Sequence, residues 1–515
     1  MPSRRELRDA IRERMCAESG TLVREAPEQV AWLYPSPYAA GMSSLGYQTL
    51  YRGIHDGGRV AHRAFLPDDV DGWRASRVPL FTYEGERPVA DYPVVATSVA
   101  YELEIAGLID ALELAGIPPL AEDRDARHPF ILAGGPLTFS NPLPLAPYVD
   151  AVLMGEADGT LQDALDVLFG TRSKDDALNA LGAIPSCWRP SRDGDAMPPI
   201  ARADDEGLPA YSQIITPGTE LRNMFLIEPE RGCHRGCAYC VMRRSTNGGM
   251  RTVAKERVLG LVPERAERVG LVGAATTDHP QIADIVGDLA DTGREVGLSS
   301  LRADRLNDRL LSALRRGGQT VLTTASDGAS QRLRDLVQRR AREDVLVKAA
   351  ELARAHRFKR LKLYMMVGLP TETDDDIDEL VAFSLELSKI VPLSLGIAPF
   401  CAKRNTPLDG SPYAGIKVVE RRLKRLRKGV KGRVDLRATS ARWAWVEYVL
   451  AQGGAAEGRA VLDAVHAGGG FRDWERAFAA LPEDRPRRAI VRPSDRIDRR
   501  QTQRAKAKAA LPVVA

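Results

Sequence analysis

The chain has 515 residues, which is too many for one ordinary core and predicts two or three domains. Its 73 basic and 69 acidic residues nearly cancel, so no overall field favours nucleic acid or a membrane surface. No apolar run approaches the ~20 residues of a membrane span, and the charged N-terminus lacks the apolar core of a signal peptide. We therefore expect no membrane span and a cytoplasmic location.

The N-terminal third alternates short apolar runs with helical stretches. Strands are predicted at 31–34, 93–98, 130–133 and 150–154, with a helix at 103–115. This alternation predicts an α/β domain of Rossmann-like, flavodoxin type, with a parallel sheet covered on both faces. Such sheets bind ligands at the carboxyl ends of their strands. The candidate ligand-binding residues there are Ser98, Gly134, Gly135, Gly155 and Glu156.

The segments 34–38, 41–46, 133–136 and 149–156 resemble a cobalamin-binding-type domain, and the resemblance covers residues 28–170. It implies that the five residues just named lie near cobalamin. The Asp-x-His-x-x-Gly segment that ligates cobalt in many such domains is missing, because His55-Asp-Gly-Gly58 has the residue types in the wrong order. Two alternatives stay open: cobalamin binds without a histidine below the cobalt, or the domain serves as a scaffold or substrate cover.

Residues 183–220 contain six prolines among charged and small residues, with little periodicity. Such composition is typical of a connector between domains. We predict a linker here.

Three cysteines, Cys233, Cys237 and Cys240, follow this linker within eight residues. An iron-sulfur cube normally takes four cysteines, so three leave one iron open for a molecule that is not protein. A zinc site is the main alternative, but structural zinc needs four closed ligands, and His234 lies between two of the cysteines. A disulfide framework does not suit a long, cysteine-poor chain.

The spacing of these cysteines, with Tyr239 just before the last, resembles the radical S-adenosylmethionine (SAM) superfamily. The resemblance implies a [4Fe-4S] cluster whose fourth iron is chelated by SAM. One electron then cleaves SAM to a 5′-deoxyadenosyl radical, and the protein positions the cofactor. The resemblance also implies a flavodoxin or ferredoxin type of electron donor. Cobalamin-binding-type domains precede many modules of this superfamily.

Further strand and helix patterns follow the cysteines. Six strands are predicted at 224–227, 269–273, 296–299, 320–323, 361–366 and 393–397, with helices such as 282–289 and 345–355 between them. This pattern matches the partial (β/α)6 barrel of the superfamily, here over 221–410. The cysteine loop would lie at the carboxyl end of the first strand, where barrel enzymes keep their chemistry.

The loops after these strands resemble the SAM-binding segments of the family. The resemblance places Asp278 at the amino group of SAM, and Ser299 and Arg302 at its ribose and carboxylate. Asp327 stands where many relatives carry Glu, and Tyr239 is part of the same set. For Asp278, Arg302 and the neighbouring His279, a salt bridge or cap at the barrel rim is the alternative.

A helical C-terminal extension is predicted over 411–481, followed by a basic, disordered tail at 482–515. Within the extension, the helix 416–430 is rich in Lys and Arg. Nucleic acid could bind such a surface, but a solvated helix face is the commoner explanation.

Together these resemblances imply a radical SAM enzyme. If cobalamin binds, the expected reaction is methylation or rearrangement of the substrate. An RNA-modifying methylthiotransferase is the second interpretation, weakened because the N-terminal domain lacks a second set of three cysteines. A non-catalytic iron-sulfur protein is the third. The sequence identifies neither the substrate, a small molecule or peptide, nor a catalytic residue.

Overall fold

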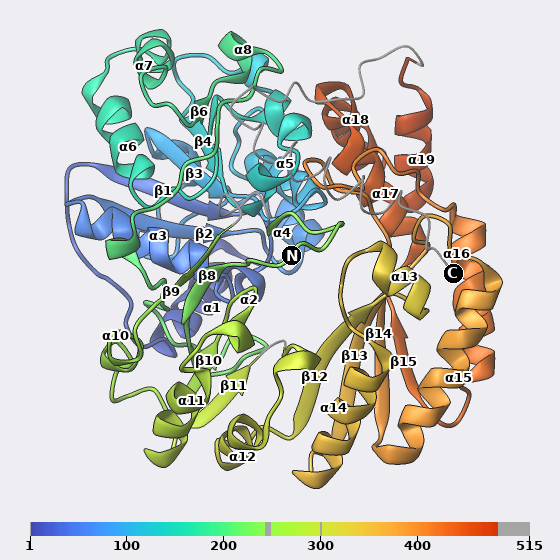
Figure 1. Cartoon of the computed structure of the whole chain (residues 1–515). Coiled ribbons are helices and arrows are strands. Elements are labelled where there is room, and N and C mark those ends of the chain that lie inside the picture. Colours follow the sequence, from blue (N-terminus) through green and yellow to red (C-terminus); the bar gives the residue numbers. More distant parts are fainter. Residues whose placement is uncertain (1, 243–248, 299–300, 483–515) are drawn as a thin grey trace. The chain divides into compact units, whose positions relative to one another are not determined.

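The computed structural model describes residues 2–242, 249–298 and 301–482, which form two compact units (Figure 1). Among the described residues, the N-terminal unit comprises 2–224 and 452–482, and the barrel unit comprises 225–451. No helix in the described ranges is both long and apolar enough to cross a membrane. The tail predicted beyond 482 lies outside the described residues.

The N-terminal unit is built on one six-stranded sheet in the order β2-β1-β3-β4-β5-β6. The first five strands pair in parallel, and β6 is antiparallel. The order 2-1-3-4-5 is that of flavodoxin-type sheets, which confirms the predicted fold class. The strands are β1 (Gln29–Tyr34), β2 (Val60–Phe65), β3 (Val94–Ser98), β4 (Phe130–Gly134), β5 (Ala151–Leu153) and β6 (Cys187–Trp188).

Strand β2 was not predicted, because its sequence interrupts the apolar run with His62 and Arg63. Arg63 is nevertheless fully buried, since Glu18 and Glu84 pair with its guanidinium at 2.7 and 2.5 Å. Burying a charge is tolerated only with such partners. One partner lies 45 residues before Arg63 and the other 21 residues after it, so no local pattern announces this strand.

Helices lie on both faces of this sheet, because the chain reverses its winding direction at β1. Helices α3 and α6 contact each other, and so do α4 and α5. The helices of this unit are α1 (Arg4–Cys16), α2 (Tyr38–Gly41), α3 (Leu45–Asp56), α4 (Val70–Ser76), α5 (Glu104–Leu114), α6 (Thr160–Gly170), α7 (Lys174–Leu181), α8 (Pro190–Asp193), α18 (Ala455–His466) and α19 (Phe471–Ala479).

The last two of these helices return to the N-terminal unit from the far end of the sequence. Helix α18 packs on α5 and on the short helix η4 (Leu143–Tyr148). The Tyr148 hydroxyl donates to the Gly458 carbonyl at 2.5 Å. A Cβ at Gly458 would lie 2.1 Å from the Pro144 carbonyl oxygen, so this close approach requires glycine. Part of the predicted C-terminal extension therefore completes the core of the N-terminal unit.

The barrel unit contains the six predicted strands, at nearly the predicted residues. They are β7 (Met224–Ile227), β10 (Arg268–Leu271), β11 (Glu295–Leu298), β12 (Val321–Asp327), β13 (Arg360–Val367) and β14 (Leu393–Pro399). A further strand, β15 (Asp435–Ala438), pairs in parallel with β14 and was not predicted. The short strands β8 (Glu230–Gly232) and β9 (Met250–Thr252) form a separate antiparallel pair.

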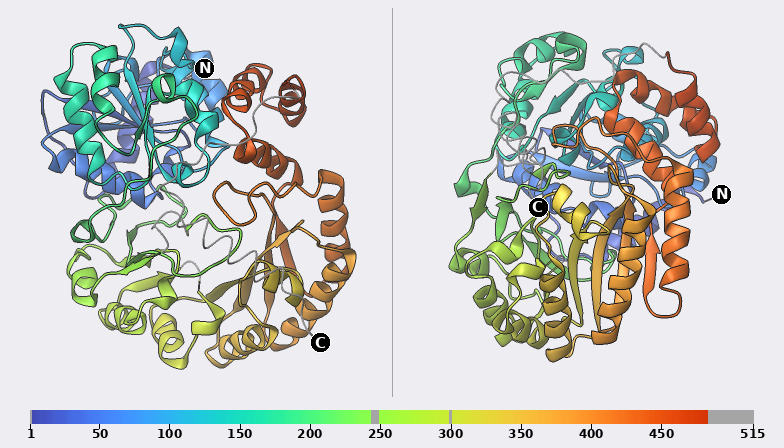
Figure 2. Two further views of the ribbon diagram at one scale, coloured as in Figure 1. Left: turned by 45° about the horizontal axis from the view of Figure 1, so that its top comes forward. Right: turned by 45° about the vertical axis from the view of Figure 1, so that its right-hand side comes forward.

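These strands form two sheets, β11-β10-β7 and β12-β13-β14-β15. The Leu301 amide donates to the Thr323 carbonyl at 2.9 Å, which connects the two sheets. Helices run along the outside of the strands, which follow an open arc (Figure 2). They are α10 (Lys255–Gly260), α11 (Ile282–Asp291), α12 (Asp308–Arg316), α13 (Gln331–Leu336), α14 (Glu343–Ala355), α15 (Asp374–Ile390), α16 (Ile416–Gly429) and α17 (Ala441–Gln452).

Strand β13 shows how the inside and outside of the arc are distinguished. Alternate residues, Leu361, Leu363, Met365 and Val367, are buried, and both α14 and α16 contact this strand. Because side chains alternate between faces, the intervening residues face the inside of the arc. Among them, Tyr364 is 42 % exposed. The strand therefore has one face in the core and one open face.

The basic helix α16 packs on the acidic start of α15. Arg421, Arg422 and Arg425 all reach Asp374, and Arg425 also pairs with Asp378 at 2.5 Å. Three of the seven basic residues of α16 are therefore paired within the unit, which leaves less unpaired positive charge for nucleic acid.

Candidate active site

The three cysteines lie on the loop that follows β8. Gly232 begins this loop with a φ of 94°, a conformation that favours glycine. Cys237 is buried, and Cys233 and Cys240 are partly buried. Burial raises the pKa of the Cys240 thiol to about 11, and the other two thiols add to this effect. Three buried or partly buried thiols that are close enough to influence one another suit a metal centre, which would hold them as thiolates.

Asp278 anchors one side of the cysteine loop. Its fully buried carboxylate accepts hydrogen bonds from the Arg235 Nε and Nη2 atoms at 2.9 and 2.7 Å, and from the Arg305 Nε atom at 2.9 Å. Burial alone would raise the pKa of Asp278, but these guanidinium groups hold it below its usual range. Because Arg235 lies between two of the cysteines, the carboxylate fixes the loop to the turn after β10.

Arg302 lies in the same cluster of charges. Its amide donates to the Thr277 hydroxyl at 3.0 Å, and its guanidinium is 3.2 Å from Asp304 and 3.9 Å from Asp278. It is also close enough to Cys233 to lower the pKa of that thiol, against the larger opposing effect of burial. The structure thus brings Asp278, Arg302 and Cys233 together. Ser299 lies outside the described residues.

Asp327 and Tyr239 meet near the end of the cysteine loop. The Tyr239 hydroxyl is hydrogen-bonded to Asp327, and burial raises the pKa values of both groups. The Ala238 amide donates to the Val337 carbonyl at 2.9 Å, so the backbone is fixed here as well. Two groups of contacts, one at Arg235 and one at Ala238 and Tyr239, therefore hold the cysteine loop.

Two residues of this site were not singled out from the sequence. Arg339 pairs with Asp327 at 2.6 Å, in an arginine-rich segment where no pattern distinguishes it. Glu230 is completely buried just before the loop and accepts from the Ala275 amide at 2.7 Å. Burial raises the pKa of Glu230 to about 8. A charged residue in a short strand beside the cysteines was the available signal for Glu230.

His279 has a structural role. Its Nε2 atom is 2.9 Å from the Val253 carbonyl oxygen, and its Nδ1 atom accepts from the Gln281 amide at 3.0 Å. Both ring nitrogens therefore hold the backbone of the turn, in agreement with the interpretation of a cap.

The donor set fits an iron-sulfur cluster. Within the described ranges, no three His, Cys, Asp or Glu side chains converge closely enough to hold a single metal ion. A cube does not need such convergence, because each thiolate binds a different iron atom. Three buried or partly buried thiols on one anchored loop therefore fit the [4Fe-4S] cluster that the family resemblance implies.

The five residues predicted near cobalamin lie at the carboxyl ends of β3, β4 and β5. Gly155 has a φ of 94°, and a Cβ there would lie 2.5 Å from the Ala201 carbonyl oxygen. The Glu156 carboxylate accepts from the Ala203 amide at 2.8 Å. These two residues therefore hold the linker. Gly135 is packed against Val99 and Ser98, and Gly134 lies beside Leu153.

The sheet order places the topological switch point elsewhere, between β1 and β3. Ligands of flavodoxin-type sheets bind at the strand ends beside this point. There Glu104 accepts from the Ser36 hydroxyl at 2.9 Å and from the Ala100 amide at 2.6 Å. Tyr101 is 46 % exposed beside them. The sequence did not indicate this position because β2, which creates the switch, was not predicted.

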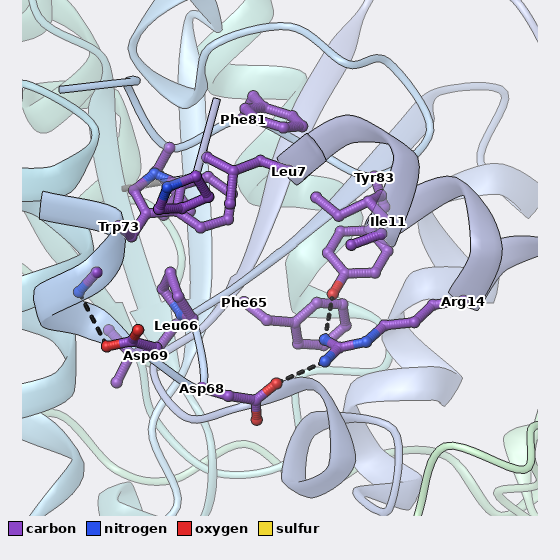
Figure 3. Close-up of a pocket in the computed structure, with 15 residues that line it drawn as sticks. Leu7, Ile11, Arg14, Phe65, Leu66, Asp68, Asp69, Trp73, Phe81 and Tyr83 are labelled. Carbon is purple, nitrogen blue, oxygen red and sulfur yellow. Dashed lines mark hydrogen bonds and ion pairs between the residues drawn. The ribbon is translucent and has the colours of Figure 1, made fainter. Parts of the chain in front are cut away.

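A small cavity of about 220 Å³ lies near the carboxyl end of β2, beneath α1 (Figure 3). Its walls are mainly apolar, and Arg14 spans its side by bonding to the Tyr83 hydroxyl at 3.1 Å and to Asp68 at 2.6 Å. The volume is below the ~300 Å³ at which ligand pockets usually begin. We assign no ligand to this cavity.

Comparison with known proteins agrees with this architecture. Residues 227–384 match the family described as the radical SAM superfamily, and residues 46–190 match the family described as radical SAM proteins, N-terminal. An uncharacterized protein of Methanocaldococcus jannaschii, MJ0966, is 27% identical over 414 residues, covering 77% of this chain and 84% of that protein. A tRNA-2-methylthio-N(6)-dimethylallyladenosine synthase of Bacillus anthracis is 23% identical, covering 51% of this chain and only 52% of that enzyme.

Two solved structures share the fold. The radical SAM methyltransferase TsrM of Kitasatospora setae, with cobalamin and a [4Fe-4S] cluster bound, has a TM-score of 0.54 at 12% identity. The similarity covers 94% of this chain and 100% of that one. The cobalamin-dependent enzyme OxsB has a TM-score of 0.50 at 13% identity, covering 78% of this chain and 56% of that one.

The family matches, the three-cysteine loop and the arc of parallel strands agree with one another. Radical SAM enzymes use a [4Fe-4S] cluster and SAM to start radical chemistry, and this chain is an enzyme of that class. The chain belongs to the radical SAM superfamily.

Proposed function

We propose that Cys233, Cys237 and Cys240 hold the [4Fe-4S] cluster at which this enzyme cleaves SAM. When bound, the cluster supplies the electron that releases the 5′-deoxyadenosyl radical. The observation that carries this assignment is the anchoring of one loop from two sides, by Asp278 and by Asp327 with its partners. Contacts of this kind keep thiols in position before a metal centre is inserted.

Arg302 is the residue that we propose for the carboxylate of SAM. Support comes from its position beside Cys233. Its guanidinium is hydrogen-bonded to Asp304 at 3.2 Å and lies 3.9 Å from Asp278. A guanidinium matches a carboxylate in charge and shape. Asp278 already accepts three short hydrogen bonds, so in this proposal it orients the arginines instead of binding the amino group of SAM.

Tyr239 and Asp327 form a further part of the proposed SAM site. The hydrogen bond between them fixes the end of the cysteine loop, and Asp327 takes up a left-handed conformation with a φ of 60°. Ser299 remains a prediction for the ribose of SAM. A flavodoxin or ferredoxin type of protein is the proposed electron donor.

The ligand assignment is tested by single Cys→Ala variants at positions 233, 237 and 240. After anaerobic reconstitution with iron and sulfide, each variant is expected to lose most of the bound iron and the visible absorbance of the cluster. Cys16→Ala is the matched control, because Cys16 is exposed in the other unit. Wild-type iron content in any of the three loop variants would remove that cysteine from the ligand set.

The proposed chemistry after SAM cleavage is methylation or rearrangement with cobalamin as a second cofactor. Support comes from the flavodoxin-type strand order and from the shared fold with two enzymes whose structures contain cobalamin. The contacts of Gly155 and Glu156 with the linker favour binding at the switch point between β1 and β3. Retention of hydroxocobalamin at one equivalent after gel filtration would support this proposal, and its complete loss would favour the scaffold interpretation.

RNA modification is the second candidate, because several relatives are tRNA-2-methylthio-N(6)-dimethylallyladenosine synthases. These relatives match over about half of their length or less, and three arginines of α16 are engaged with α15. We therefore place this function behind the cobalamin-dependent one.

A further inference from the structure

The segment after α13 has an unusual backbone conformation on both sides of Arg339. The residues on either side, Gln338 and Arg340, have φ values of 54° and 57°. Residues other than glycine rarely adopt this left-handed backbone conformation, because it is strained. Such strain persists only where the surrounding structure imposes it. Here the preceding Val337 carbonyl accepts from Ala238, within the cysteine loop. The strained segment is therefore fixed against the cluster loop.

The Arg339 guanidinium reaches from this segment to a cysteine. Its Nη1 atom lies 4.0 Å from the Cys237 Sγ atom. Its Nε atom pairs with the Asp327 carboxylate at 2.6 Å, and the Ala325 carbonyl oxygen lies 3.4 Å from Nε and Nη2. Only 13 % of the Arg339 side chain is exposed. The charge is therefore held in a fixed, largely buried position.

A cation in this position acts on the reduction of the cluster. The reduction potential of an iron-sulfur cluster depends on its net charge, on hydrogen bonds to its sulfurs and on solvent exposure. An arginine stays protonated in proteins, and partial burial weakens the screening of its field. The guanidinium favours the state that carries one more electron, whereas the Asp327 carboxylate opposes this effect.

We propose that Arg339 raises the reduction potential of the cluster through the Cys237 sulfur. The negative charge of Asp327 partly cancels this increase. The inference rests on the proposed role of Cys237 as a cluster ligand. The step is the transfer of one electron to the cluster from a flavodoxin- or ferredoxin-type donor, or from dithionite in the laboratory. No covalent bond of Arg339 or Cys237 is made or broken.

The test is a redox titration of the reconstituted protein, followed by the EPR signal of the reduced cluster. Arg339→Met is expected to lower the equilibrium constant for reduction about tenfold, which is about 59 mV for a one-electron couple. Arg339→Lys keeps the charge and is expected to retain most of the wild-type potential. Asp327→Asn removes the opposing carboxylate and is expected to raise the potential.

Arg340→Met is the matched control. It removes the neighbouring arginine, which is exposed and is itself in the left-handed conformation. The reduction potential of this variant is expected to equal the wild-type value. Because the titration follows only cluster-loaded molecules, reduced occupancy in a variant does not mimic the effect. An unchanged potential in Arg339→Met, or shifts of the same sign in Arg339→Met and Asp327→Asn, would overturn the inference. Absence of a cluster from the wild-type protein would instead overturn the proposed function.

Discussion

At the scale of single residues, buried charges determine where the cysteine loop lies. Asp278 pairs with the guanidinium groups of three arginines, Arg235, Arg302 and Arg305. Because Arg235 is part of the cysteine loop, its ion pair with Asp278 fixes the loop. Charge-assisted hydrogen bonds of this kind are about twice as strong as neutral ones. The position of the cysteines therefore depends on side chains that need not bind the cluster themselves.

Replacing Asp278 with Asn tests this dependence. The change removes the negative charge opposite Arg235, Arg302 and Arg305, so we expect the affinity for SAM to fall at least about tenfold, or about 1.4 kcal/mol. Equilibrium binding of SAM to the reconstituted protein measures it. Asp291→Asn, at an exposed ion pair with Arg316, is the control. Equal affinities in the two variants would contradict the assigned role of Asp278.

The raised pKa of Glu230 should make the stability of the protein depend on pH. Its pKa is raised from 4.5 to about 8, so the folded protein retains a proton that the unfolded chain has released. The free energy of unfolding should therefore fall as pH rises from about 4.5 to 8, by at most about 1.4 kcal/mol per pH unit.

In the Glu230→Gln variant, the side chain at position 230 is neutral in both the folded and the unfolded state. The free energy of unfolding should therefore depend less on pH than in the wild type. Urea unfolding across this pH range measures the difference. The surface variant Glu267→Gln should keep the wild-type slope. A slope in Glu230→Gln equal to that of the wild type would show that Glu230 is ionised when buried.

The sequence predicted part of the site at this scale. The cysteines, Asp278 and Arg302 follow recognisable spacings or strand ends, and the structure places them together. Arg339 could not be found in this way, because its approach to Cys237 depends on two left-handed residues in a loop 102 positions away along the chain. Contacts of that separation leave no local pattern.

At the scale of elements, a buried ion pair joins α16 to the loop before α15. The Arg422 Nη1 atom donates to the Glu372 carboxylate at 2.9 Å, and this carboxylate also accepts from the Gly368 amide at 2.8 Å. Burial raises the pKa of Glu372 to about 7, against the opposing effect of Arg422. The position of the basic helix is therefore tied to the end of β13.

Arg422→Met should lower the free energy of unfolding by about 3 kcal/mol, because it leaves Glu372 buried without its partner. The double variant Arg422→Met with Glu372→Gln should recover part of this loss. Denaturant unfolding followed by circular dichroism measures both, with the exposed Arg421→Met as control. A double variant less stable than Arg422→Met alone would contradict this account of the pair.

Gly155 gives a second prediction at this scale. Gly155→Ala should destabilise the contact between β5 and the linker by about 1–3 kcal/mol, because its backbone is left-handed and Ala201 leaves no room for a Cβ. Limited proteolysis of the linker reports the change. Gly159→Ala, which has free space, is the control. Equal cleavage rates in both variants would contradict the proposed contact.

Strands with regular apolar runs were predicted correctly, and those that depend on distant partners were missed. Strands β10 to β14 alternate or carry apolar runs, so their sequence indicates them. Strand β2 contains Arg63, whose burial requires two distant carboxylates, and β15 is a short strand with polar residues at its exposed positions. Their pairing is decided by tertiary contacts.

At the scale of the whole molecule, the chain combines a flavodoxin-type unit and a radical SAM barrel unit. Each unit was predictable from its alternation of strands and helices. The return of α18 and α19 to the N-terminal unit was not, because it depends on close packing of Gly458 against Pro144 at a separation of more than 300 residues.

The central claim, that the three-cysteine loop starts radical chemistry, is tested most directly by measuring 5′-deoxyadenosine. The reconstituted protein is incubated anaerobically with SAM and dithionite, beside a variant with Cys233, Cys237 and Cys240 replaced by Ala. We expect 5′-deoxyadenosine from the wild-type protein and from Cys16→Ala, and none above background from the triple variant. Equal amounts from the triple variant and the wild type would contradict the assignment of the cluster to this loop.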